Sequence, residues 1–133
     1  MSAVRPAQGR TAPGRQKVLD AMLEKDFQTG VLKLARFHGF ALAYHTHDSR
    51  RSAPGFPDLV LVNPPTGRVL WRELKTNKGR VSPEQRAWLD GLTAAGMDAG
   101  VWRPNDLDTG LVVAELRGET FTQQTSCQAS NDA

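Results

Sequence analysis

The first regular pattern of apolar residues along the chain has the period of an α-helix. Four apolar residues recur at spacings of three and four positions: Leu23, Phe27, Val31 and Leu34. They define one buried stripe of a helix predicted over residues 21–38, and Gly39 is a natural place for that helix to end. Glu24 lies roughly 60° from the centre of the stripe, so its side chain should point along the boundary between this helix and a sheet.

Three segments with strand-like patterns follow this helix. Residues 40–47 (FALAYHTH) alternate as in a half-buried strand, and residues 58–62 (DLVLV) form a compact apolar run. The short turn NPPTG separates that run from residues 69–75 (VLWRELK), so these two segments are predicted to pair as an antiparallel hairpin. A polar, basic loop, DSRRSAPG, separates the first strand from the hairpin.

A second helix has strong start signals after the loop TNKGRV. Ser82 is a typical N-cap, Pro83 suits the first helical position, and Gln85 completes a capping box. Gly96 is a natural end for this helix. The capping pattern therefore predicts both the position and the direction of the helix.

The pattern continues with a short strand over residues 98–102 and a last helix over residues 108–116. The predicted order is helix, three strands, helix, strand, helix. The helix between the last two strands allows them to run parallel, whereas the NPPTG turn forces the preceding pair to be antiparallel. The sequence therefore predicts an α/β fold in which helices flank a mixed β-sheet.

Length and composition limit this fold to one domain, because 133 residues can bury one core but hardly two. The folded domain is predicted over residues 17–118. Residues 1–16 are rich in Pro, Gly, Ala and Arg and predict a flexible basic arm, and residues 119–133 predict a disordered polar tail. The formal charge of +3 and the pI near 9.4 suit an anionic partner such as nucleic acid without establishing one.

Two features bear on the cellular compartment. Cys127 is the only cysteine, so the chain can form no internal disulfide. No uninterrupted apolar run approaches the ~20 residues that a membrane span needs, and the basic N-terminal segment has no apolar region behind it. The sequence therefore predicts a soluble, cytoplasmic protein without a membrane partner.

Charged residues stand at one end of the predicted hairpin. Glu73 and Lys75 are two positions apart, so their side chains project from the same face of their strand. Residues equidistant from the turn oppose each other, which brings Asp58 level with Glu73. Two close carboxylates need a positive charge between them, and oxygen ligands without His or Cys select Mg²⁺ or Mn²⁺. With a lysine beside them, these are the parts of metal-assisted phosphodiester hydrolysis.

The residues of this hairpin resemble a known nuclease motif. Pro57 and Asp58, followed by Glu73, a leucine and Lys75, are similar to the PD-(D/E)XK motif. The surrounding segments GFPD and ELKTNKGRVSPEQ resemble specifically the VRR-NUC group, the virus-type replication-repair nucleases. PD-(D/E)XK alone is a loose pattern, but three further positions of the group follow in the right order: Gly79, Ser82 and Gln85.

The resemblance covers the chain from Glu24 to Pro104 and implies a restriction-endonuclease-like core, with a phage or prophage as the source. It also implies catalytic roles for five side chains: Glu24, Asp58, Glu73, Lys75 and Gln85. The metal would be bound by Asp58 and Glu73 with help from the backbone carbonyl of Leu74. Glu24 would reach the metal directly or through water, and the lysine of the motif would act on the attacking water.

Two further assignments have competing interpretations. Gln85 would complete the site, but a capping-box glutamine needs no other function, so both interpretations stay open. Four basic residues lie on the loops that precede and follow the catalytic strands: Arg50, Arg51, Lys78 and Arg80. They are predicted to contact DNA phosphates, and the alternative is a solvated loop without a ligand.

Together, the residues and the resemblance predict a Mg²⁺- or Mn²⁺-dependent DNA endonuclease that leaves a 5′-phosphate and a 3′-hydroxyl. The resemblance implies selectivity for branched DNA such as a Holliday junction, in phage replication, recombination or repair inside a bacterial host. A symmetric junction needs two cuts and a chain this small offers one site, so a homodimer is expected. The alternatives are a nucleic-acid-binding module that does not cut and a restriction-type endonuclease.

Overall fold

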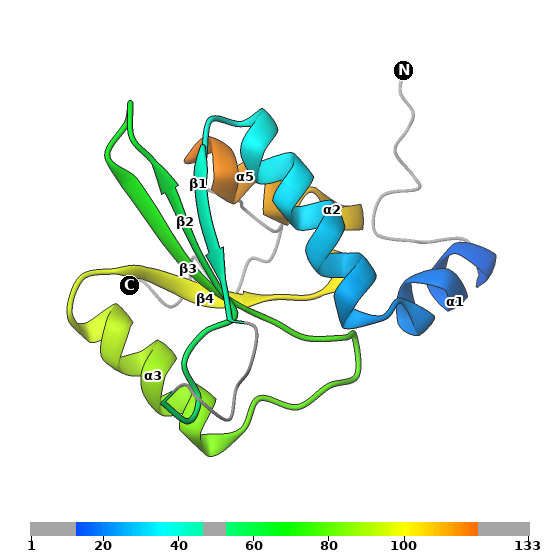
Figure 1. The fold of residues 1–133 in the computed structure, drawn as a ribbon. Coiled ribbons are helices and arrows are strands. Elements are labelled where there is room, and N and C mark those ends of the chain that lie inside the picture. The colour runs from blue at the N-terminus through cyan, green and yellow to red at the C-terminus, as the bar shows by residue number, and fades with distance from the viewer. Residues whose placement is uncertain (1–12, 47–52, 120–133) are drawn as a thin grey trace, which may run out of the picture.

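The computed structural model describes residues 13–46 and 53–119. Its centre is a sheet with the strand order β1-β2-β3-β4 (Figure 1). The four strands are β1 (Leu42–His45), β2 (Leu59–Asn63), β3 (Arg68–Leu74) and β4 (Asp98–Trp102). β2 is antiparallel to both of its neighbours, β1 and β3, whereas β3 and β4 run parallel. The mixed sheet that the sequence predicted is therefore confirmed.

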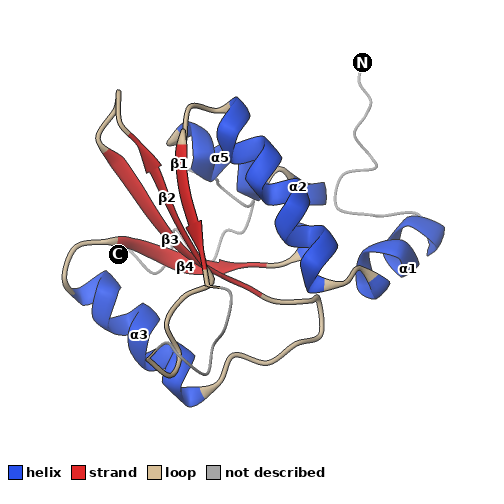
Figure 2. Cartoon of the chain, in the orientation of Figure 1, coloured by secondary structure: helices blue, strands red, loops and turns tan. Residues whose placement is uncertain are grey.

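Helices cover both faces of this sheet (Figures 1 and 2). On one face lie α2 (Glu24–Phe37) and α5 (Leu111–Arg117), and on the other lies α3 (Pro83–Ala94). α3 connects β3 to β4, because parallel neighbouring strands need a crossover connection, which is usually a helix. No helix among the described residues has the length and apolar character that crossing a bilayer requires.

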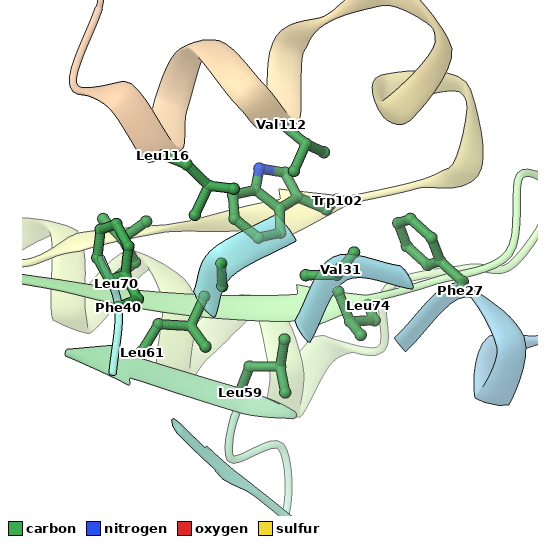
Figure 3. Close-up of a cluster of buried hydrophobic side chains, with 11 residues drawn as sticks. Phe27, Val31, Phe40, Leu59, Leu61, Leu70, Leu74, Trp102, Val112 and Leu116 are labelled. Atoms are coloured by element: carbon green, nitrogen blue, oxygen red, sulfur yellow. The ribbon is translucent and has the colours of Figure 1, made fainter. Parts of the chain in front are cut away.

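The main core lies between the sheet and the helices α2 and α5 (Figure 3). Its buried members are Phe27, Val31, Ala35, Phe40, Leu59, Leu61, Leu70, Leu74, Trp102, Val112 and Leu116. The alternation of strand side chains explains which strand residues take part, since every second residue of β2 and β3 points to this face. Two members of the predicted helical stripe are in the core, whereas Leu23 is 64% exposed and precedes α2 as its N-cap.

The predicted first helix is in fact two helices, because α1 (Pro13–Ala21) ends before α2 begins. α1 also begins inside the predicted flexible arm, so that prediction is wrong for residues 13–16. The cause is contact with distant residues: Arg15 Nε donates a hydrogen bond to Asp108 at 2.6 Å, and Leu19 is buried. The rest of the predicted arm, residues 1–12, lies outside the described residues, as do residues 120–133 of the predicted tail.

The predicted last helix is also divided, into α4 (Pro104–Thr109) and α5. Gly110 separates them with a φ of 92°, a left-handed conformation that glycine adopts without steric cost. The strand bounds differ less from the predicted ones. β1 begins two residues later than predicted because Phe40 turns into the core, and β4 has the predicted bounds.

Candidate active site

The two faces of β3 carry different kinds of side chain. Leu70 and Leu74 belong to the core on the side of α2 and α5. Alternation therefore puts Glu73 and Lys75 on the opposite face, on the side of α3. Glu73 is only 2% exposed, so its carboxyl group depends on neighbouring side chains or a ligand in place of water.

Asp58 lies directly before β2 and next to Glu73. Leu59 pairs with Arg72 in the β2–β3 register, so Asp58, one residue earlier, lies level with Glu73, one residue later. Oδ2 of Asp58 accepts a hydrogen bond from the backbone N–H of Leu74 at 2.9 Å. The two carboxylates therefore stand side by side at one end of the sheet, as the hairpin geometry predicted.

The two oxygens of Glu73 have different surroundings. Oε2 accepts a hydrogen bond from Gln85 Nε2 at 2.8 Å and lies 3.7 Å from Lys75 Nζ. Oε1 is buried and has no hydrogen-bond partner among the described residues. Burial and then the negative charge of Asp58 raise the pKa of Glu73 to about 8, and the ammonium group of Lys75 opposes this rise. Oε1 is therefore a buried acceptor to which no donor among the described residues is bonded.

Gln85 takes part in both interactions that the sequence left open. Its backbone N–H donates to Ser82 Oγ at 3.1 Å, and its Oε1 accepts from the backbone N–H of Ser82 at 2.8 Å, which completes the capping box. Its Nε2 donates the hydrogen bond to Oε2 of Glu73. One side chain thus joins the first turn of α3 to the carboxylate on β3, so the two interpretations are compatible.

The loop before Asp58 packs tightly against the same turn of α3. Gly55 has a φ of 85°, and a Cβ atom on it would lie 2.4 Å from backbone atoms of Glu84. Such a distance is far below van der Waals contact, so only glycine fits here. The close approach brings the loop that carries Asp58 and the helix that carries Gln85 to the same place.

Glu24 approaches the site from the first turn of α2. Although the residue as a whole is exposed, partial burial of its carboxyl group raises its pKa above the ordinary value. The negative charge of Asp58 raises it further, and Lys75 lowers it. Three acidic side chains and one lysine therefore interact electrostatically at this end of the sheet.

These oxygen donors fit a hard divalent cation. A buried carboxylate oxygen without a partner, beside a second carboxylate, is the arrangement that a bound Mg²⁺ or Mn²⁺ ion would satisfy. Among residues 13–46 and 53–119, no three His, Cys, Asp or Glu side chains form a metal cluster by themselves. Water or substrate oxygens would have to complete the coordination, which is usual for Mg²⁺.

Comparison with known proteins places this arrangement in a family. The model of the VRR-NUC domain matches residues 16–105, which is more than half of the chain. The chain belongs to the VRR-NUC domain family. This match confirms the family that the sequence motifs resembled.

Three known proteins that resemble the chain agree with this family. Fanconi-associated nuclease 1 homologs of Schizosaccharomyces pombe and Caenorhabditis elegans are 34% identical over 56 residues and 46% identical over 52 residues. The matches cover 42% and 39% of this chain but only 8% and 6% of those relatives. A solved structure of a VRR_NUC domain protein has a TM-score of 0.51 at 19% identity, and covers 71% of this chain and 90% of its own. That structure supports the α/β fold.

In this VRR-NUC domain the loop between β3 and α3 is held by a residue that the sequence did not indicate. Arg103 directly follows β4, and its Nη1 donates hydrogen bonds to the backbone carbonyls of Thr76 and Gly79, both at 2.7 Å. The side chain of Asn77 in this loop donates to Asp20 at 2.8 Å. The loop directly after Lys75 is therefore tied to both α1 and the end of β4. No local pattern reveals these contacts, because they join residues far apart in the chain.

The other predicted site residues of the VRR-NUC domain are described in part. Lys78 and Arg80 are exposed on the loop that Arg103 holds. Arg50 and Arg51 lie outside the described residues. The backbone of Leu74 contacts the site through its N–H, and the role of its carbonyl oxygen stays a prediction.

Proposed function

We propose that this VRR-NUC domain is a metal-dependent DNA endonuclease. One observation carries the proposal: the buried Glu73 stands beside Asp58 and is contacted by Lys75 and Gln85 at an end of the sheet. A purely structural role does not explain this arrangement, because burying one carboxylate beside another is costly without a cation. The curated relatives, which are named as nucleases, support the same activity.

Asp58 and Glu73 would hold Mg²⁺ or Mn²⁺, with the carbonyl of Leu74 and the carboxylate of Glu24 as further ligands, the latter directly or through water. When bound, the ion supplies positive charge that neutralises these carboxylates, polarises a phosphate and lowers the pKa of water. Gln85 donates a hydrogen bond to Oε2 of Glu73, so Oε1, which has no partner among the described residues, would be the oxygen that binds the ion.

Lys75 supplies the second function that hydrolysis needs. Its ammonium group, 3.7 Å from Glu73 Oε2, can hold the attacking water or a phosphate oxygen and stabilise negative charge on the phosphate as it develops. The water oxygen would bond to phosphorus as the bond to the 3′ oxygen breaks, and the proton that the water loses would be balanced by one taken up by the leaving 3′ oxygen. The products are a 5′-phosphate and a 3′-hydroxyl.

The substrate we propose is branched DNA such as a Holliday junction, cut by a homodimer. The support is the family resemblance together with the size of the chain, which offers one site where a symmetric junction needs two cuts. Four basic residues would contact DNA phosphates: Arg50, Arg51, Lys78 and Arg80. A phage or prophage source and a role in replication, recombination or repair stay predictions from the same resemblance.

Cleavage assays with end-labelled Holliday-junction, fork and linear duplex DNA in Mg²⁺, Mn²⁺ or EDTA test this function. The wild type should cut the branched substrates only with metal, and Glu73→Ala and Lys75→Ala should each lower the rate at least about 10²-fold, the usual contribution of such groups. Glu84→Ala and Lys33→Ala, which remove exposed charges, serve as matched controls and should retain the wild-type rate.

Other outcomes point to the alternatives. Binding of DNA without cleavage of any substrate by the folded wild type would support a non-cleaving module. Site-specific cleavage of linear duplex would support a restriction-type endonuclease. Equal activity of Glu73→Ala and wild type would exclude the proposed site.

A further inference from the structure

The side chain of Asn77 uses both polar atoms of its amide group on residues far away in the chain. Its Nδ2 donates hydrogen bonds to Asp20 Oδ1 at 2.8 Å and to Asn105 Oδ1 at 3.0 Å. Its Oδ1 accepts a hydrogen bond from the backbone N–H of Asn105 at 3.0 Å. Gln16 Nε2 donates to the same two side-chain oxygens, at 2.9 and 3.1 Å. One amide group thus joins the loop after β3 to α1 and to the start of α4.

Asp20 contributes a charged acceptor to this cluster. The hydrogen bonds from Asn77 and then from Gln16 lower the pKa of Asp20, so it is a carboxylate near neutral pH and can only accept hydrogen bonds. The donating amide of Asn77 is complementary to this carboxylate. A second carboxylate at position 77 would repel it.

The hydrogen bond between Asn77 and Asp20 connects the chain on two sides of the candidate active site. Asp20 is four residues before Glu24, and Asn77 is two residues after Lys75. In Figure 1 the chain that leaves β3 passes close to the junction of α1 and α2, where this bond forms. The bond therefore joins the segment that leads to one proposed site residue to the segment that follows another.

The first turn of α2, which carries Glu24, needs support from outside its own helix. Its N-cap, Leu23, makes no side-chain capping hydrogen bond, and leucine is among the poorest residues at this position. The N–H groups of a first turn have no acceptor within the helix, so an end without a cap tends to fray. Only Met22 and Leu23 separate this turn from α1, so a docked α1 restrains it.

The loop at the other end of the hydrogen bond has a support of its own. Arg103 Nη1 holds this loop through the carbonyls of Thr76 and Gly79. Loss of the bond between Asn77 and Asp20 should therefore free α1 and the first turn of α2 before it frees the loop.

We propose that Asn77 is a positioning residue: by holding α1 through Asp20, it restrains the first turn of α2 and fixes Glu24 in the candidate active site. α1 is then a working part of the site and not an arm attached to it. The restraint on α1 is a property of the fold, whereas its consequence for cleavage rests on the proposed function.

An exchange of the two bonded side chains tests the first step. Asn77→Asp sets two carboxylates against each other and should accelerate amide hydrogen exchange over residues 13–24 more than over residues 75–82. The double variant Asn77→Asp/Asp20→Asn again has one amide and one carboxylate in contact and keeps the net charge of the wild type, so it should restore slow exchange. Asn105 can turn its own amide group to donate to the new carboxylate.

A double-mutant cycle with Glu24 tests the second step. Asn77→Asp should lower the single-turnover cleavage rate of the wild type about tenfold or more, because small misplacements of a site residue are costly. In a Glu24→Ala background the same substitution should change the rate by less than about twofold, because the residue that it displaces is already gone. The Mn²⁺ concentration for half-saturation, measured by electron paramagnetic resonance of the free ion, should show the same pattern. Thr93→Asp, which adds a negative charge to an exposed position of α3, is the matched control and should alter none of these quantities.

Unchanged exchange over residues 13–24 in Asn77→Asp overturns the proposal. An equal loss of cleavage in both backgrounds also overturns it, because the effect of Asn77 would then lie elsewhere, such as at the neighbouring Lys78. Failure of the proposed function gives a different result: a folded wild type that binds Mn²⁺ but cuts no DNA refutes the nuclease, and the cycle in Mn²⁺ binding then decides on Asn77. A wild type that neither binds Mn²⁺ nor cuts DNA refutes both.

Discussion

At the scale of the residue, Glu73 is the group whose chemistry the fold changes most. Burial and the neighbouring Asp58 raise its pKa to about 8, so near neutral pH the carboxyl group holds a proton when no cation is present. A divalent cation would compete with that proton for the same oxygens. Metal binding and proton release should therefore be linked in this protein.

This linkage predicts how stability depends on pH without metal. The pKa of Glu73 is about 8 in the folded chain and about 4.5 in the unfolded chain, so the folded state holds the proton through that interval. The stability that this proton contributes is complete below pH 4.5 and is lost as the pH rises through 8. In EDTA the wild-type Tm should fall by several degrees between pH 5 and pH 9 relative to Glu73→Gln, since 1 kcal/mol corresponds to about 4 °C.

Differential scanning calorimetry of both proteins measures this effect. Asp90→Asn, which removes an exposed carboxylate, should follow the wild-type pH dependence. Adding Mg²⁺ at pH 9 should raise the Tm of the wild type and leave that of Glu73→Gln unchanged. Parallel pH curves for the wild type and Glu73→Gln would contradict the raised pKa.

At this scale the sequence was sufficient for part of the site. Period-two alternation and the short hairpin turn place Asp58, Glu73 and Lys75 together with no knowledge of distant contacts. The second hydrogen bond of Gln85 could not be derived in this way, because it depends on how α3 packs against β3. Arg103 has no local signal, since its acceptors are carbonyls 24 to 27 residues earlier.

At the scale of the element, the first turn of α3 serves both helix capping and the site, and variants can separate these roles. Ser82→Ala removes a hydroxyl that caps the helix and should lower stability by about 1 kcal/mol while cleavage at 25 °C is retained. Gln85→Glu keeps a residue that suits the capping box but adds a third carboxylate beside Glu73. We expect it to lower kcat more than tenfold, whereas Ser82→Ala retains the wild-type kcat.

Thermal unfolding and single-turnover cleavage on the same samples give both quantities. Equal losses of activity in Ser82→Ala and Gln85→Glu would mean that Gln85 acts only as a cap.

The loop after β3 gives a second prediction at this scale. Arg103→Ala leaves the carbonyls of Thr76 and Gly79 without their donor, and we expect a loss of about 1–3 kcal/mol in stability. Amide hydrogen exchange over residues 75–82 should accelerate. Exchange in α2, to which these hydrogen bonds do not reach, should change only as far as the free energy of global unfolding changes. Arg117→Ala is the control, because that arginine is exposed. Unchanged exchange in the loop would mean that Arg103 does not hold it.

Elements with strong local signals were predicted closely, and elements defined by distant contacts were not. The capping box gave the start of α3, and the turn residues gave the hairpin. α1 could not be predicted because its contacts, such as the bond from Arg15 to Asp108, join residues 93 positions apart. The prediction began the last helix at residue 108 and so missed most of α4, because residues 104–109 (PNDLDT) are mainly polar and have no apolar period.

At the scale of the whole molecule, the site is formed by three separate parts of the chain. Glu24 comes from the helix on one face of the sheet, Asp58 and Glu73 from the β2–β3 hairpin and the residue before it, and Gln85 from the helix on the other face. The order of elements was sufficient to predict the mixed sheet, because chain direction and connection length determine which strands run parallel. The place of β1 at the end of the described sheet could not be inferred in that way, since an alternating pattern does not tell whether a strand is central or at an edge.

The contact between Gly55 and the backbone of Glu84 has a consequence for how this protein tolerates change. The residue has no functional group, yet any side chain on it would push the Asp58 loop and α3 apart and so lengthen the distance across which Gln85 reaches Glu73. In a saturation library selected for activity, position 55 would thus be as intolerant as the acidic residues themselves. Gly55 would then be counted among the catalytic positions, although it has no side chain that could take part in the reaction.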